Sequence, residues 1–512
     1  MTKVLVVSND PLSDLMPGPA IRAWNLAEVL SKSHEVKLVS TVACSRSTES
    51  FDCLLAEPGR RPGLERWADV ALIGAGGLHD WPSLTGSDSA LVVDAYDPYH
   101  LENLEGGPEE GLGQRYDRVR RMSEAINRHL GLGDYFLCAT DRQRDFWLGS
   151  LASIGRVNPY LYDSDPTLSD LLGVVPFGLP AARPERTGPG LKGSVKGIGA
   201  DDKVLLWAGG VYNWFDPVTL VRAMPNVVHR VPAAKLVFLG MQHPNPAIPA
   251  MRAAAEARRA SEELQLTDSV AFFREGWVPY DERANFLLDA DVGVSTHLDH
   301  IETRFSFRTR VLDYLWASLP MVLTEGDVLA EELADAGLAR TVVSGDVDGL
   351  ADALVEALES DRPDEESLER VRERYHWSTV ARPLLQFCES PRRAADRLAP
   401  KRPEASQVPL ADPTDSYTLP VPSPKSTVSQ LRERAIGGLI RTIASNTADE
   451  AVGRVSARIA EVERILGDQG DSADEVAEII GRTLTRLSAE VTGLSSEIAL
   501  LRERLEQLKS PT

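Results

Sequence analysis

Two successive series of short apolar runs, each rich in β-branched residues, limit the fold of this chain more than any other feature of its sequence. In the first series, strands are expected at Val4–Ser8, Val36–Ser40, Val70–Gly74, Leu91–Asp94 and Tyr135–Ala139. Between them, patterns of helical period predict helices at Ala20–Ser31, Gln114–Leu130 and Arg142–Leu151. Strands that are apolar throughout are typical of a parallel sheet covered by helices on both faces. Residues 1–175 are therefore predicted to form one α/β domain.

The pattern then restarts and predicts a second α/β domain over residues 176–397. Its expected strands are Val204–Ala208, Leu236–Leu239, Val270–Phe273, Val292–Ser295, Met321–Thr324 and Thr341–Ser344. The segment Val174–Pro180 is interpreted as the hinge between the domains. Proteins with two such domains bind ligands in the cleft between them, at the carboxyl ends of the strands.

The last part of the chain has a different character. Residues 398–427 are predicted to be a linker, because seven prolines fall between Pro400 and Pro424. Residues 428–512 are predicted to be a helical tail, in which apolar residues from Ile480 to Leu508 recur at intervals of four and three. This heptad pattern predicts a parallel homodimer through residues 480–508. The alternatives are an antiparallel hairpin within the tail and docking of the tail on the body.

The net charge of -21 argues against binding to nucleic acid, which requires a basic surface. The four cysteines lie far apart without metal-site spacing, which indicates reduced thiols and a cytoplasmic location. The first residues already read as a strand rather than a signal peptide, and no apolar run reaches the roughly 20 residues of a membrane span. The basic stretch Arg115–Arg121 is either a solvated helix face or a peripheral contact with the inner face of a membrane.

The segment from Glu302 to Pro320 carries the strongest signal for a binding site. It places Glu302, Arg304, Arg308, Arg310 and Asp313 around the start of an apolar helix. A helix N-terminus favours anions, and arginines at that end favour a phosphate or diphosphate. A carboxylate one turn further on can accept hydrogen bonds from sugar hydroxyls. The alternative is an arginine-rich surface loop.

Other polar or glycine-rich residues follow the predicted strands and are expected to line the same cleft. The candidates for donor binding are Gly209, Gly210, Gly240, Glu275 and Gly276, and those for a loop that binds the acceptor or a phosphate are Gly18 and Arg22. Glycines after a strand allow a phosphate to approach the backbone. Each of these turns is almost as well explained without a ligand.

In the first domain, Asp97 and His100 follow a strand and are candidates for work on an acceptor hydroxyl. Structural roles are at least as plausible for both. Asp289 and Asp291 match a loose metal-binding pattern, but their place at a helix end indicates caps. No Cys/His cluster has zinc spacing, so no metal or other cofactor is expected.

Taken in order, these elements resemble the retaining GT-B glycosyltransferases of glycosyltransferase family 4. The likeness covers roughly residues 1–395 and rests on the Gly18 loop, the hinge Val175–Gly178, Gly209, Gly276–Pro279 and Ala317–Pro320. The resemblance implies two Rossmann-like domains, with the nucleotide-sugar on the second and the acceptor on the first. It implies transfer of a sugar from a nucleoside diphosphate to a hydroxyl, with retained configuration, and an acceptor that is a glycan or lipid-linked, in cell-surface glycan or glycolipid synthesis.

The sequence departs from that family at the residues that bind the diphosphate. The usual arginine and lysine of the second domain are replaced by Gly210 and Phe215, and the usual pair of glutamates falls on Phe305 and Asp313. The three arginines of the 302–313 segment are the natural substitutes, with Glu302 in place of the first glutamate. A non-catalytic GT-B scaffold that assembles through its coiled coil is the alternative function, and a sugar-nucleotide epimerase is a third.

Overall fold

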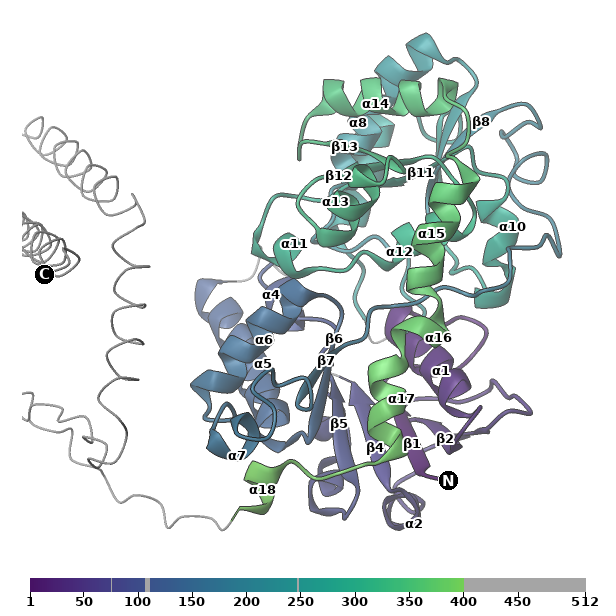
Figure 1. The fold of residues 1–512 in the computed structure, drawn as a ribbon. Coiled ribbons are helices and arrows are strands. Elements are labelled where there is room, and N and C mark those ends of the chain that lie inside the picture. Colours follow the sequence, from purple (N-terminus) through teal and green to yellow (C-terminus); the bar gives the residue numbers. More distant parts are fainter. Residues whose placement is uncertain (75, 106–110, 246–247, 400–512) are drawn as a thin grey trace, which may run out of the picture. The chain divides into compact units, whose positions relative to one another are not determined.

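The computed structural model describes residues 1–74, 76–105, 111–245 and 248–399 (Figure 1). The tail predicted over 428–512, its coiled coil at 480–508 and all but the first two residues of the predicted linker lie outside the described residues. The described residues form two α/β domains.

The first domain is built on a parallel sheet of order β3-β2-β1-β4-β5-β6-β7. Its strands are β1 Lys3–Ser8, β2 Glu35–Ser40, β3 Asp52–Leu55, β4 Val70–Gly74, β5 Ala90–Asp94, β6 Tyr135–Cys138 and β7 Leu172–Val174. Its helices are α1 Gly18–Leu30, α2 Arg61–Trp67, α3 Gly77–Asp80, the short helix η1 Pro82–Gly86, α4 Tyr99–Glu102, α5 Leu112–Leu132, α6 Asp141–Ser153 and α7 Pro159–Tyr162.

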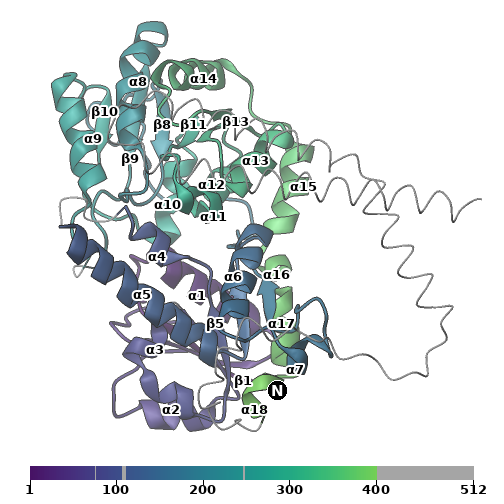
Figure 2. The same cartoon turned by 90° about the vertical axis from the view of Figure 1, so that its left-hand side faces the viewer.

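The second domain repeats this plan with a parallel sheet of order β10-β9-β8-β11-β12-β13. Its strands are β8 Lys203–Trp207, β9 Ala234–Phe238, β10 Ala271–Phe273, β11 Val292–Ser295, β12 Met321–Thr324 and β13 Ala339–Val342. The helices are α8 Pro217–Arg230, α9 Arg252–Glu263, η2 Tyr280–Glu282, α10 Arg283–Leu287, α11 Ile301–Phe305, α12 Thr309–Trp316, α13 Val328–Asp335, α14 Val347–Glu359 and α15 Glu365–Tyr375. Figure 2 shows α8 beside α14, which pack together.

The strand β1 shows why the apolar runs fold in this way. Val4 and Val6 belong to one buried apolar cluster, whereas Leu5 and Val7 belong to another on the opposite face of the sheet. Because successive side chains of a strand point to opposite faces, a strand covered by helices on both sides must be apolar at every position. The prediction of two parallel α/β domains is confirmed.

Two strands were not predicted. The edge strand β3 has only four residues and begins with Asp52, and β7 has only three residues, with Gly173 in the middle. A short run of this kind has too few apolar positions to show a period. The other strands agree closely with the predicted ranges.

The hinge contains a second crossing of the chain that the sequence does not reveal. The amide of Leu179 donates to the carbonyl of Tyr375 at 2.8 Å, and the amide of Trp377 donates to the carbonyl of Leu179 at 3.2 Å. Gly178 is required here, since a Cβ atom at this position would lie 2.6 Å from the indole of Trp377.

The chain then continues as α16 Trp377–Val380, α17 Arg382–Glu389 and α18 Ala395–Leu398, drawn in light green beside the first domain in Figure 1. Contacts fix these helices there: Thr2 Oγ1 donates to Cys388 O at 2.7 Å, and Arg156 forms an ion pair with Asp396 at 2.7 Å. The predicted boundary, with all residues up to 397 in the second domain, therefore differs from the structure, which packs this last part against the first. The apolar pattern of a terminal helix does not indicate which sheet it covers.

Two of the four cysteines, which the sequence separates by nine positions, come close together in space. The Sγ atoms of Cys44 and Cys53 are 3.2 Å from each other; Cys44 stands in the connection between β2 and β3, and Cys53 is the second residue of β3. Both are free thiols. Among the described residues, no helix combines the length and apolar character needed to cross a membrane.

Candidate functional site

The carboxyl ends of the two sheets border one cavity of about 370 Å³. It is lined from the first domain by the β1–α1 loop and the segment after β5, and from the second domain by the loops after β8, β9 and β10 and by the start of α12. Its charged lining residues are Asp10, Asp97, Glu102, Arg283, Glu302, Arg308, Arg310 and Asp313. The cavity therefore brings together residues of both domains that the sequence marks as candidates for a site, among them Asp97, Arg308 and Arg310.

The two glycines predicted after β8, Gly209 and Gly210, line this cavity, whereas Gly240 after β9 lines an adjoining pocket. Gly209 and Gly240 have φ angles of +84° and +75°, in the region that favours glycine. A Cβ atom at Gly240 would also lie 3.0 Å from the ring of Trp277. Gly210 contributes a carbonyl group rather than open space for a phosphate, because its oxygen accepts a hydrogen bond from Arg310 at 2.6 Å. Contacts with Trp277 and Arg310 thus account for the need for glycine at 240 and for the place of the Gly210 carbonyl.

Arg310 is the cation of this wall that has no counter-ion among the described residues. Its guanidinium lies over the rings of Trp207 and Phe215, at 4.3 and 4.1 Å from their centroids. Nη2 donates to Gly210, while Nη1 is buried without a hydrogen-bond partner. Burial lowers the pKa of Arg310 to about 10, which still leaves it charged at neutral pH. A buried charge without a partner is costly, so an anion beside this atom would be stabilising.

Arg308 and Glu302 neutralise each other. Nη1 and Nη2 of Arg308 donate to the two carboxylate oxygens of Glu302 at 2.9 and 2.6 Å, and both side chains are almost completely buried. Both residues line the cavity, as expected from the sequence. Their paired state means that Arg308 brings no net charge to a donor phosphate unless Glu302 is also protonated or moved.

Arg304 does not lie at the cavity and is exposed to solvent. The reason is helical geometry: successive residues turn by about 100°, so when Glu302 points inward along α11, the residue two positions later points away. The prediction that all three arginines act together on the donor is therefore not supported at Arg304.

Asp313 follows one turn into α12 and pairs with Arg283, whose Nε lies 3.2 Å from its Oδ1. The guanidinium of Arg283 packs on the rings of Tyr280 and Trp316, with centroids at 3.9 and 4.5 Å. Both charged residues line the cavity. No signal in the sequence points to Arg283, because its partner stands 30 residues later in the chain.

Arg22, predicted for an anion-binding loop, has a structural role. Nε and Nη2 donate to the two carboxylate oxygens of Asp94 at 2.6 and 3.0 Å, and Nη1 and Nη2 donate to the carbonyls of Pro176 and Val175 at 2.8 Å each. Its side chain is only 2% exposed. Arg22 therefore ties α1 to β5 and to the hinge and has little capacity left for an anion. Gly18, at the start of α1, does line the cavity.

The carboxylates of the first domain are more numerous than predicted. Asp97 faces the cavity together with Asp10 and Glu102, which were not among the predicted site residues. Burial raises the pKa of Asp10 to about 6, and burial with the nearby charges of Asp94 and Glu302 raises the pKa of Asp97 to about 7. Burial also raises the pKa of Glu102 well above its usual value. Asp10 could have been found, because it stands just after β1.

His100 is absent from the lining of this cavity, in contrast to the expectation that it works on an acceptor. Its ring stacks on Phe146, with 5.7 Å between centroids, and lies 6.0 Å from the ring of Trp147. Burial lowers the pKa of His100. The helix α4 turns His100 toward α6, while Asp97, before the helix begins, faces the cavity.

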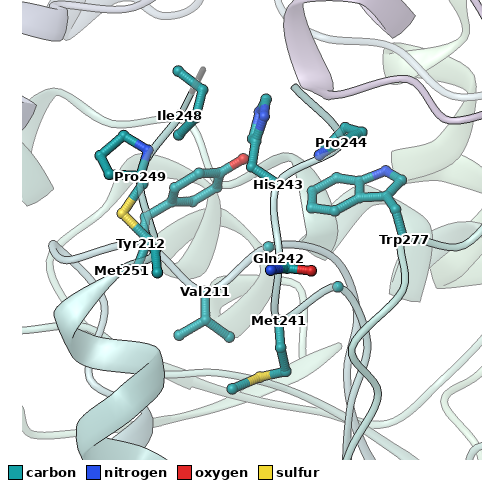
Figure 3. A pocket seen from close by; sticks show the side chains of 13 residues that line it. Val211, Tyr212, Met241, Gln242, His243, Pro244, Ile248, Pro249, Met251 and Trp277 are labelled. Atoms are coloured by element: carbon teal, nitrogen blue, oxygen red, sulfur yellow. The ribbon is translucent and has the colours of Figure 1, made fainter. Parts of the chain in front are cut away.

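An aromatic pocket of about 250 Å³ adjoins the cavity (Figure 3). The ring of His243 lies between those of Tyr212 and Trp277, with centroids 6.3 and 5.7 Å away, and Met251 and Pro249 line the side of Tyr212. Tyr212 in turn stacks on Trp214 at 4.9 Å. The pocket offers flat apolar surfaces beside Gly240, which suits a planar ring.

Glu275 and Gly276 line neither this pocket nor the cavity. The side chain of Glu275 is 66% exposed and pairs with Arg258 on α9. The predicted donor-binding role therefore has no geometric support at these two residues, although their neighbour Trp277 lines both the pocket and the cavity.

Residues 202–360 match the family model described as "Glycosyl transferases group 1". This range contains all six strands of the second sheet and the arginines of the cavity's second wall. Comparison with curated proteins by sequence gives no match.

Solved structures show the same fold over the two domains. The sucrose-phosphate synthase of Thermosynechococcus elongatus aligns with a TM-score of 0.54 and 14% identity, over 76% of this chain and 98% of that one. HepE of Anabaena aligns with a TM-score of 0.51 and 12% identity, over 76% and 100% of the two chains. An E. coli structure described as "Trehalose-6-phosphate" gives a TM-score of 0.51 and 14% identity, over 76% and 99%. The second domain is therefore similar to group 1 glycosyl transferases in sequence, and the two domains together share the fold of these structures.

Proposed function

We propose that the protein is a glycosyltransferase that takes a sugar from a nucleoside diphosphate and joins it to a hydroxyl of an acceptor. The observation that carries this proposal is the buried Nη1 of Arg310, a cation without a partner at the wall formed by the second domain. A diphosphate is the part of the donor that would supply the missing negative charge. The group 1 glycosyl transferase match over this domain supports the same substrate class.

The reaction breaks the bond between the anomeric carbon and the diphosphate oxygen and forms a bond from that carbon to the acceptor oxygen. Negative charge then accumulates on the departing diphosphate. A guanidinium that is already held in place by Trp207, Phe215 and Gly210 stabilises this charge without reorganisation. The acceptor proton leaves with a phosphate oxygen or with a carboxylate of the cavity. Retention of configuration and a role in cell-surface glycan synthesis are proposals that rest on the family resemblance alone.

We assign the nucleobase to the aromatic pocket that adjoins the cavity. The pocket and the cavity share Gly210, Tyr212 and His243, so a base in the first would leave the diphosphate near Arg310 in the second. Two of the structures with the same fold are described as complexes with UDP-glucose and with UDP-2-fluoro glucose, which supports this class of donor.

The test measures nucleotide binding by the purified full-length protein. Its thermal unfolding temperature is compared with and without UDP, GDP, dTDP and ADP. A nucleotide that binds only the folded state raises the unfolding temperature. The variant Arg310→Lys keeps the charge but loses the planar fork, and we expect it to weaken diphosphate binding about tenfold or more. Arg304→Lys is the matched control, since Arg304 is exposed and outside the cavity.

If the Arg310→Lys variant binds each of the four nucleotides as tightly as the wild type does, the assignment of Arg310 to the diphosphate is wrong. Hydrolysis of nucleotide-sugars by the wild type then separates an enzyme from the alternative of a non-catalytic scaffold. The pairing of Arg308 with Glu302 is the observation in favour of that alternative, because it removes one positive charge from the donor wall.

A further inference from the structure

We propose that the acceptor is a polyhydroxylated compound that carries a protonated amine, such as an amino sugar or an aminocyclitol, and that the wall formed by the first domain binds that amine. This proposal rests on the proposed function and names the substrate class of its acceptor.

The charges of the cavity are separated between its two walls. The wall of the first domain contributes Asp10, Asp97 and Glu102, and the described residues of this wall include no lysine, arginine or histidine that faces the cavity. None of these three carboxylates has an ion-pair partner within 4 Å among the described residues. An anionic acceptor, such as a sugar phosphate, would find no cationic side chain on this wall.

The wall of the second domain does not compensate for these charges. Its arginines at positions 283 and 308 are paired with Asp313 and Glu302, so Arg310 is the one cavity arginine of the described residues without a carboxylate. In the proposed function, the diphosphate uses that cation. The carboxylates of the first wall are then left for the acceptor.

A recess of about 140 Å³ opens beside Asp10 and Asp97, at the carboxyl ends of β1, β4 and β5. The amide nitrogen of Asn9 donates to Asp80, which leaves Oδ1 of Asn9 as an acceptor, and this oxygen is buried without a donor. The recess is therefore lined by the carboxyl groups of Asp10 and Asp97, for which the described residues supply no side-chain hydrogen bond or ion pair, and the unsatisfied oxygen of Asn9 lies in the same loop.

The donors around the recess are already committed. Arg22 donates to Asp94 and to two hinge carbonyls, the Ser8 hydroxyl donates to Asp10 O at 3.0 Å, and the Tyr96 hydroxyl donates to Phe307 O at 3.3 Å. A ligand for this recess must bring its own donors. An alkylammonium brings three N–H donors, no acceptor and a positive charge, and so it matches both the hydrogen bonding and the electrostatics.

A metal ion fits the geometry less well. Among the described residues, no three His, Cys, Asp or Glu side chains converge closely enough to hold one. The raised pKa values of Asp10, Asp97 and Glu102 agree with a cationic ligand, because burial penalises the charge of each, and neighbouring carboxylates add repulsion at Asp97 and Glu102. A bound cation would offset these penalties.

The experiment compares four ligands of similar size by calorimetric or NMR titration of the full-length protein at pH 7: glucosamine, glucose, N-acetylglucosamine and glucose 6-phosphate. We expect glucosamine to bind about tenfold or more tightly than glucose and N-acetylglucosamine, as hydrogen bonds to charged groups predict. Glucose 6-phosphate should bind most weakly. Equal affinity for glucosamine and glucose, or tighter binding of the phosphate, overturns the proposal.

Substitutions of the wall carboxylates then test where the amine binds. Glu102→Gln and Asp10→Asn should each reduce the preference for glucosamine over glucose by a factor of about three or more, while Glu105→Gln, a change in the same segment but outside the cavity lining, should preserve it. An unchanged preference in both cavity variants overturns the assignment of the wall. These titrations need neither donor nor turnover, so a failure here is distinct from a failure of nucleotide binding, which would refute the proposed glycosyltransferase activity.

Discussion

Arg22 and Arg310 are both buried arginines at the carboxyl ends of a parallel sheet, and the sequence presents both as candidates for binding an anion. The structure separates them by their partners. Arg22 is bound on three of its nitrogens by Asp94 and the hinge, whereas Nη1 of Arg310 has no partner and no counter-ion among the described residues. Burial alone therefore does not identify a functional arginine. The absence of a carboxylate around a buried cation is the observation on which the proposal for Arg310 rests.

The largest expected effect concerns Arg22. The change Arg22→Met leaves Asp94 buried without its partner and frees two hinge carbonyls, so we expect a loss of about 3–5 kcal/mol in the free energy of unfolding. Urea and thermal unfolding measure it. The double variant Arg22→Met with Asp94→Asn should recover part of the loss, because it removes the orphaned charge. If the single variant keeps its stability but loses ligand binding, Arg22 belongs to the binding site and not to the framework of the domain.

A substitution of Arg310 should reduce activity and leave stability unharmed, the opposite of the effect expected at Arg22. The change Arg310→Met removes a preorganised cation, so we expect turnover of the nucleotide-sugar, as kcat/KM, to fall by about 2–4 kcal/mol of transition-state stabilisation, or roughly 30- to 1,000-fold. Stability should stay the same or rise, since an unpaired buried charge is removed. The control is Arg304→Met, which should change neither quantity. A large loss of stability with normal turnover would give Arg310 the same structural role as Arg22.

Asp97 tests the acidic wall through the pH dependence of stability. Its folded-state pKa of about 7 exceeds the ordinary 3.8, because burial and the nearby carboxylates of Asp94, Glu302 and Glu102 disfavour its charge. Arg22 and Arg308 lower the pKa, but by less. The folded state thus binds the proton more tightly, and wild-type stability should fall as the pH rises from about 4 to 7.

The variant Asp97→Asn cannot ionise at this position, so it should be more stable than the wild type at pH 8, by on the order of 1–3 kcal/mol, with the gain lost near pH 4. Unfolding temperatures at both pH values measure the difference. If the wild type is the more stable protein at pH 8, Asp97 is not held in a repulsive site.

Much of the fold and the location of the cavity could be predicted from local sequence. The strands of both sheets followed from composition, because a strand that is buried on both faces must be apolar at each position, as β1 is. The cavity followed from the rule that ligands bind at the carboxyl ends of parallel strands. Asp97, Glu302, Arg308, Arg310 and Asp313 all line it.

The roles of these residues depend on partners that sequence does not reveal. Asp94 lies 72 residues after Arg22, and Cys53 meets Cys44 across a loop, although no local pattern pairs them. The direction in which a side chain points is the second property that local sequence does not predict. His100 and Arg304 stand close in sequence to cavity residues, and helical rotation turns both of them away.

The smallest expected effect concerns Asp313, whose pairing with Arg283 lies between the two extremes. Its side chain is 35% exposed, so the ion pair adds little to stability, and Asp313→Asn should shift the unfolding temperature only slightly. If Asp313 accepts a hydrogen bond from a donor hydroxyl, the apparent KM for the nucleotide-sugar should rise by about 3- to 10-fold, the value of one ordinary hydrogen bond.

Arg283→Gln provides the control for this last effect. It keeps Asp313 in place but removes the guanidinium that packs on Tyr280 and Trp316. A direct role of Asp313 predicts that Asp313→Asn raises KM more than Arg283→Gln does. Equal changes in the two variants would mean that the pair acts only as a unit that shapes the cavity. In that case Asp313 would have a structural role like that of Arg22, and Arg310 alone would bind the donor from α12.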